Sequence, residues 1–249
     1  SDIGVMKHFC IAIAYSQGSQ SRIIGKLIDT RQFKEAFHGF DFHALAQADP
    51  ENILDAHWPI LKSMRFRSKV EKIVQCARIL GDIVREHGSF AKFLNGYKIP
   101  RRLKISQDID TFWTAFEDLR KDLLRRGMPF FRHTTSLLQL LLDLNHDAIK
   151  PDLIIMRLCY RLGITQKETG DKHFRHAVRF LQEYAIKRKL SANALDWALL
   201  AFGGQTGAGS LLQFNYCEPS SICTNDRCQV GSGGFCLAHK QLPSLLKTA

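Results

Sequence analysis

The chain of 249 residues contains no uninterrupted apolar run of about 18 residues, the length that a membrane-spanning helix needs. Its apolar opening, Ile11 to Tyr15, is also shorter than the core of a secretory signal. We find no internal repeat and no low-complexity tract. The glycine-rich stretch GGQTGAGS lacks the Lys-Ser or Lys-Thr that follows a phosphate-binding loop, so we interpret it as a flexible connection. These absences predict a cytoplasmic globular protein without a membrane segment.

Acidic residues are scarce relative to basic ones. The chain has 24 Asp and Glu against 35 Lys and Arg, which gives a net charge of +11. Between residues 150 and 189 there are ten basic and four acidic residues. Such an excess favours a polyanionic partner, nucleic acid first of all, although many basic globular proteins bind no nucleic acid. With 45% hydrophobic residues, the chain can form one large domain or two small lobes.

Strand alternation is almost absent, and helical periodicity dominates the chain. We therefore predict an all-α protein. The expected helices are Ile23 to Leu27, Phe33 to Phe37, Pro50 to Leu54, Arg67 to Arg85, Ser89 to Leu94, Ile109 to Arg126, Thr134 to Leu144, Asp152 to Leu162, Asp171 to Lys189 and Ala192 to Phe202. Helix-breaking joints are expected at His57 to Pro59, Gly96 to Arg102, Gly127 to Pro129, Asn145 to Pro151 and Gly203 to Ser210.

The stretch PDLIIMRLCYRLG, residues 151–163, places a carboxylate in front of an apolar helix. Asp152 occupies the expected N-cap position, and Gly163 is a natural stop. Backbone amides and the helix dipole favour an ionised carboxylate there. Such a group can stabilise a positive charge that develops on a sugar or orient a water molecule. The alternative is a cap that only satisfies backbone donors.

The order Asp152, Arg157, Cys159 and Arg161 resembles the catalytic helix of the helix-hairpin-helix base-excision DNA glycosylases, the endonuclease III type above all. Two further segments support the resemblance. FRSKVEKIVQCARIL, with Lys69, Ile73, Ala77 and Leu80 at helical spacing, is similar to the early core helix of this superfamily. FKEAFHGFDFHALAQADPENIL is similar to the two helices that open the alkyl-purine glycosylases.

This resemblance implies a monomeric, two-lobed helical bundle with a C-terminal metal or cluster loop. The glycosylase domain would span residues 1–210, with the catalytic helix at 152–162 and Asp152 between the lobes. Residues 211–249 would form the four-cysteine loop and the tail. Arg157 and Arg161 would contact DNA.

The hairpin of the superfamily is changed in this chain. Its position holds MPFFRHTTSLLQLLLDL, in which Pro129 is kept but Phe130 and Arg132 replace the two glycines. Arg132, His133 and Thr134 could instead bind a DNA phosphate through side chains and amides at a helix start. The alternative is that the aromatic residues pack in the core and that Arg132 is solvated.

The resemblance also bears on the reaction. Bifunctional members carry a lysine eighteen residues before the catalytic aspartate, and this position is Thr134 here. A hydroxyl cannot form the imine that strand cleavage needs, so a monofunctional enzyme is expected, with Lys150 as the amine that could act instead. The target base must leave the stack. Aromatic and polar candidates for its pocket are Phe37, His38, Phe42 and Trp197, and the alternative is that these side chains form core.

Four of the seven cysteines lie within twenty residues of each other. Cys217, Cys223, Cys228 and Cys236 have five, four and seven residues between them. This density favours a metal site over disulfides in a protein without a secretory signal. The resemblance implies a 4Fe–4S cluster, although the spacing departs from that of the superfamily. Zinc is the alternative, with His239 as a substitute ligand. The remaining cysteines, Cys10, Cys76 and Cys159, are expected to be small buried hydrophobes.

The sequence thus predicts a DNA N-glycosylase that removes a damaged or modified base from double-stranded DNA and leaves an abasic site. Two other functions fit the same residues. One is a DNA-binding module of the same fold that has lost catalysis, and the other is a zinc-stapled adaptor that binds acidic proteins.

Overall fold

The computed structural model describes residues 1–203, 217 and 228–240 of the chain. Within these ranges every regular element is a helix and there is no strand, which confirms the all-α prediction for this part of the protein. None of the helices described is long and apolar enough to cross a membrane.

The chain divides into two compact units. Unit 1 comprises residues 1–99 and 115–132, and unit 2 comprises residues 100–114 and 133–249. Helix α8, Ser106–Arg125, belongs to both, since the boundary falls within it. The predicted tail, residues 211–249, falls in unit 2 and lies mostly outside the described residues.

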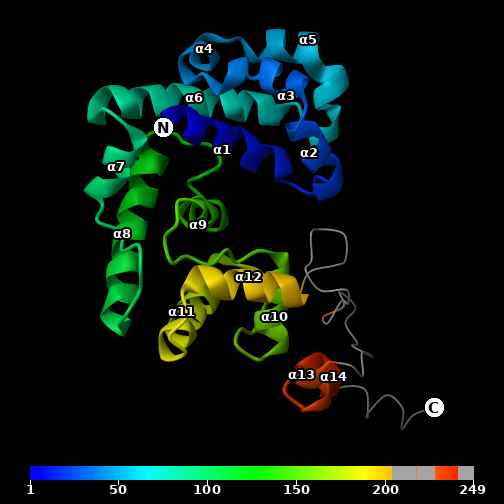
Figure 1. The fold of residues 1–249 in the computed structure, drawn as a ribbon, viewed down its shortest axis with the longest axis vertical. Helices are drawn as coiled ribbons and strands as arrows, with labels where there is room; N and C mark the ends of the chain where they lie inside the picture. The colour runs from blue at the N-terminus through cyan, green and yellow to red at the C-terminus, as the bar shows by residue number, and fades with distance from the viewer. Residues whose placement is uncertain (204–216, 218–227, 241–249) are drawn as a thin grey trace, which may run out of the picture. The chain divides into compact units, whose positions relative to one another are not determined.

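Unit 1 is organised around the long helix α6, Ser68–His87 (Figure 1). Helices α1, α4 and α7 pack against it. The predicted face of α6, with Lys69, Ile73, Ala77 and Leu80, is buried as expected. The other helices of unit 1 are α1 Asp2–Tyr15, α2 Ser21–Ile28, α3 Arg31–Ala36, η1 His38–Phe40, α4 Phe42–Gln47, α5 Pro50–Leu61, η2 Lys62–Met64 and α7 Phe90–Gly96.

Short polar residues start several helices of unit 1. Thr30 accepts a hydrogen bond from the Phe33 amide at the start of α3, and Asp41 caps α4. Asp49 caps α5, where Pro50 occupies the first helical position. These are the residue types whose side-chain oxygens satisfy the free amides of a first turn.

One predicted joint is wrong. The sequence placed a break at His57 to Pro59, but α5 continues through Pro59 to Leu61. Proline removes a single amide hydrogen bond in the last turn, and the chain beyond it is held by Leu61 and Met64, both fully buried. Burial of these two side chains therefore outweighs the local cost.

Unit 2 contains helices α9 Thr134–Asp143, α10 Leu153–Arg161, α11 Asp171–Lys187, α12 Ala192–Gly203, α13 Gln229–Ser232 and α14 Leu237–Lys240. Helices α10, α11 and α12 pack against one another (Figure 1). The last residue of α12, Gly203, comes so close to α10 that an added Cβ would lie 2.8 Å from Ile154 Cγ2 and from Leu158 Cδ1. Arg157 Nη2 also donates a hydrogen bond of 2.7 Å to the carbonyl oxygen of Gly203.

Candidate functional site

Asp152 is the N-cap of α10, as the sequence predicts. Its Oδ1 accepts hydrogen bonds from the amides of Ile154 at 2.9 Å and Ile155 at 3.1 Å. The side chain is half-buried, and no hydrogen bond to a described residue uses Oδ2. The cap therefore fixes one oxygen of the carboxylate, and the other has no hydrogen bond to a described residue.

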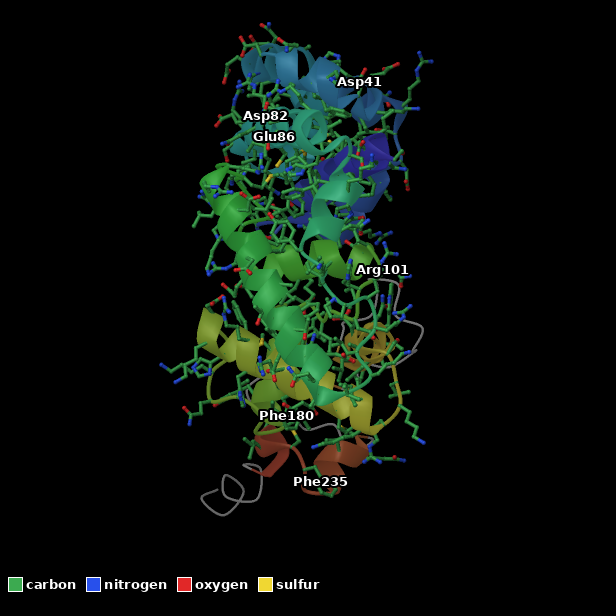
Figure 2. The ribbon with its side chains drawn as sticks, turned by 90° about the vertical axis from the view of Figure 1, so that its left-hand side faces the viewer. Asp41, Asp82, Glu86, Arg101, Phe180 and Phe235 are labelled. Carbon is green, nitrogen blue, oxygen red and sulfur yellow. The ribbon has the colours of Figure 1, made fainter. Side chains whose placement is uncertain are left out.

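The segment that leads into α10 is held by a buried carboxylate. Asp147 Oδ2 accepts the amide of Leu103 at 2.9 Å, and its Oδ1 pairs with Arg102 at 3.1 Å. The Asp147 amide donates to the carbonyl oxygen of Arg101 at 2.9 Å. Gln182 of α11 donates to the Asp147 carbonyl at 3.1 Å. Figure 2 shows where Arg101 lies.

A second buried carboxylate, Asp196 of α12, lies behind Asp152. Its Oδ1 accepts the Lys150 amide at 2.9 Å, and only 1% of the residue is exposed. Burial raises the pKa of Asp196 to about 7, with further increases from the charges of Asp152 and Asp143. The bond from the Lys150 amide and the charge of Lys150 lower it.

Sequence reasoning did not select Asp196 as a site residue. The signal was a single acid in the otherwise apolar run ALDWALLAFG, residues 194–203. A lone Asp inside a buried helix needs a partner, and such groups gather at functional sites.

The four residues predicted for a base pocket have different environments. Phe37 is 0% exposed and packs against Phe33, with ring centroids 4.9 Å apart; Phe42 is also buried. His38 is exposed and lines a cavity of about 320 Å³ in unit 1, together with residues of α3, α4 and α5. In unit 2, Trp197 is 68% exposed and directly follows Asp196. Trp197 and His38 are therefore the two that a ligand can reach.

Among the predicted DNA contacts, His133 is exposed and Arg132 is half-buried. His133 is the N-cap of α9. Thr134 is buried, and its hydroxyl donates a hydrogen bond to Asp171 Oδ1. The start of α9 thus presents Arg132 and His133, rather than Thr134, to solvent.

The two arginines of α10 form hydrogen bonds with partners inside unit 2. Arg157 donates to Gly203, as described above, and Arg161 is 5% exposed. Arg161 Nη1 lies 3.0 Å from Cys217 Sγ. Both guanidinium groups therefore have a structural partner at the positions where the resemblance implied DNA contacts.

Three of the four clustered cysteines line one small cavity of about 20 Å³. They are Cys217, Cys228 and Cys236, all buried, and Arg161 lines the same cavity. Cys223 lies outside the described residues, as does the side chain of His239. Within the described part, no group of three or more His, Cys, Asp or Glu side chains is placed to hold a metal ion. The predicted burial of Cys10, Cys76 and Cys159 is confirmed.

Comparison with known proteins gives one match. A family model described as methyladenine glycosylase matches residues 7–140, more than half of the chain. The matched region includes the segment at residues 33–54 that is similar to the alkyl-purine glycosylases, and it ends before Asp152 and the four cysteines. Neither the curated proteins nor the solved structures gave a significant match.

Proposed function

Because the chain belongs to the methyladenine glycosylase family, we propose that it is a DNA glycosylase that hydrolyses the bond between a damaged or modified base and its deoxyribose in double-stranded DNA. A methylated adenine is the first substrate to test, since the family description names it. The observation that carries the choice of catalytic residue is the capped carboxylate of Asp152, one oxygen of which has no hydrogen bond to a described residue.

Asp152 would act by charge. As the bond from C1′ to the base nitrogen breaks, the electron pair leaves with the base and the sugar becomes cationic. A carboxylate held in place beside that cation stabilises it without reorganisation. Water then adds to C1′ and loses a proton, which leaves an abasic site. A methylated purine that is already cationic leaves as a neutral base, so this reaction needs no separate general acid.

The reaction we propose is monofunctional. Strand cleavage through an imine needs a free amine, and the position eighteen residues before Asp152 carries the buried hydroxyl of Thr134. Lys150 is the nearest amine along the chain, and its backbone amide is bound to Asp196. The side chain of Lys150 is half-buried, so its participation is open to a direct test.

We place the DNA contacts at the start of α9. His133 and Arg132 are accessible there, and the first amides of a helix favour a phosphate. Trp197, which is exposed next to Asp196, is the aromatic side chain we propose to stack on the everted base.

The test uses duplex DNA treated with a methylating agent. Released bases are identified by mass spectrometry, and abasic sites are counted after alkaline cleavage. We expect methylated adenine to be released by the wild-type protein. In Asp152→Asn the release should fall by about 10²-fold or more, since the charge is lost. Asparagine is as good an N-cap as aspartate, so the free energy of unfolding and the duplex affinity should be kept.

The matched control is Asp143→Asn, which removes an exposed carboxylate at the end of α9. It should leave base release unchanged. Activity of Asp152→Asn equal to that of the wild type would contradict the role of Asp152. If the wild type binds duplex DNA but releases no modified base, the protein is a binding module of this fold instead.

We further propose that the four clustered cysteines hold a metal that fixes the tail. In support, three of the thiols line one cavity, although the described side chains are not placed as a set of metal ligands. The resemblance favours a 4Fe–4S cluster, while a cavity of about 20 Å³ has room for about one atom and favours zinc. Either group would supply structure, and no step of the reaction uses it. Absorbance in the visible range, together with iron and sulfide found by chemical analysis, would indicate the 4Fe–4S cluster. Zinc found by elemental analysis would indicate the alternative. A folded protein that contains no metal would contradict both.

A further inference from the structure

We propose that Asp196 is a positioning residue that holds Asp152 in place from α12, and that it does so with its own carboxyl group neutral. This inference rests on the proposed function, in which Asp152 is the catalytic carboxylate. The two claims separate experimentally, because the position of Asp152 can be measured without substrate.

The two oxygens of the Asp196 side chain have different surroundings. Its Oδ1 accepts the Lys150 amide, while its Oδ2 is buried and has no hydrogen-bond partner in the described part of the chain. An ionised carboxylate with one oxygen buried and unpaired is costly. A proton on Oδ2 removes the buried charge, which is the larger part of that cost, and leaves Oδ1 free to accept.

Most of the charges near Asp196 raise its pKa. Asp152 and Asp143 favour the neutral acid, and Lys150 opposes them. The arginines of α10 are engaged with Gly203 and Cys217. The half-buried Arg175 and Arg179 of α11 bond to Asp171 and Asp110. The buried residues of α11 are all uncharged; they are Ala177, Val178, Leu181, Gln182 and Ala185.

Asp196 is connected to the Asp152 cap through the backbone of Lys150. Lys150 donates its amide to Asp196, and its carbonyl oxygen accepts the Asp152 amide at 2.8 Å. Asp152 in turn caps α10 through Ile154 and Ile155. The Asp196 carboxyl group is thus two hydrogen bonds away from the Asp152 backbone. A change of its charge or shape therefore reaches the catalytic carboxylate along one short stretch of backbone.

Ionisation of Asp196 would place a second, uncompensated negative charge in this buried position. The carboxylate would have to draw in water or move, and the Lys150 to Asp152 segment would move with it. We expect the wild-type rate of base release to fall as the pH rises through about 7, where Asp196 loses its proton.

Two variants separate shape from charge. Asp196→Asn keeps an oxygen acceptor for the Lys150 amide and stays neutral at every pH. Asp196→Leu keeps the branched shape of the side chain, although it is larger, and removes the acceptor. Glu183→Gln is the control, since it removes an exposed carboxylate of α11 that does not act on Asp196.

The first experiment measures amide hydrogen exchange in the free protein. In Asp196→Leu the Lys150 amide should lose protection, and the Ile154 and Ile155 amides should exchange at least about fivefold faster. In Asp196→Asn and Glu183→Gln these amides should stay protected. If the Ile154 and Ile155 amides of Asp196→Leu exchange at the same rate as in the wild type, the positioning role is overturned. This readout does not depend on activity, so it decides the inference even if Asp152 proves not to be catalytic.

The second experiment measures single-turnover release of methylated adenine between about pH 5.5 and 8.5. Asp196→Leu should be at least about tenfold slower with duplex affinity unchanged, because a small displacement of a catalytic group is costly. Asp196→Asn should keep the rate near pH 6 and lose the decline through pH 7. A decline in Asp196→Asn that equals that of the wild type would overturn the claim that the neutral acid matters. A wild-type rate that is flat or rises through pH 7 would overturn it as well.

Discussion

Thr134 Oγ1 donates a hydrogen bond to Asp171 Oδ1, which joins the first residue of α9 to the first residue of α11. The hydroxyl is buried and engaged at the position where bifunctional relatives of the resembled superfamily carry an amine. We predict that borohydride traps no covalent complex between the protein and DNA that carries an abasic site. Denaturing gels measure this directly. A complex that disappears in Lys150→Met would show that Lys150 acts as the amine instead.

The buried ammonium of Lys69 stabilises unit 1. Its Nζ donates to the carbonyl oxygens of Ala14 at 3.0 Å and Ser16 at 2.6 Å, and to Ser19 Oγ at 2.8 Å. Lys69→Met leaves both carbonyl oxygens without this donor at the end of α1. We expect the free energy of unfolding to fall by about 2 to 3 kcal/mol in urea denaturation followed by circular dichroism. Lys72→Met, on the same helix but only half-buried, should change it by less than about 0.5 kcal/mol.

Gly203 permits the close contact between α12 and α10. In Gly203→Ala the new Cβ would lie 2.8 Å from two side-chain carbons of α10, so we expect a loss of about 1 to 3 kcal/mol in thermal or urea unfolding. Gly96→Ala is the control, because it lies in α7 and its Cβ meets nothing within 4 Å. That change should be neutral or slightly stabilising. Equal effects of the two substitutions would argue against the contact.

The free energy of unfolding should depend on pH through the ionisation of Asp196. Burial raises its pKa from 3.8 to about 7, so the folded protein binds this proton more tightly than the unfolded chain does. The stabilisation of the folded protein by this proton is fully present below about pH 4 and is lost as the pH rises through about 7. The free energy of unfolding falls by at most about 4 kcal/mol over this range. We expect the free energy of unfolding of the wild type, minus that of Asp196→Asn, to decrease over this range. The same difference taken with Glu183→Gln, which removes an exposed carboxylate of α11, should not follow this course.

Local patterns were sufficient to predict most helices. The face of α6 and the N-cap role of Asp152 follow from spacing and from residue type, which depend on near neighbours in sequence. Helix α1 was missed, although Met6, Phe9, Cys10 and Ile13 recur at helical spacing and are all buried. The short α4 was missed as a separate element because six residues hold too little periodicity.

The partners of buried polar groups could not be predicted from the sequence. Arg157 and Arg161 look like DNA contacts from their positions on α10, but their partners, Gly203 and Cys217, are distant in sequence. The same holds for Asp196, whose partner Lys150 lies 46 residues away. Aromatic residues posed a similar problem, since composition does not distinguish the buried Phe37 from the exposed Trp197. These distinctions depend on which helix packs against which.

Helix α10 carries Asp152 at its first end and Arg161, with its thiol contact, at its last. Nine helical residues form a rod of about 14 Å, which transmits a push at one end to the other. A single rigid element therefore joins the Asp152 cap to the Cys217 contact, so a substitution at Cys217 acts on the same helix that Asp152 begins.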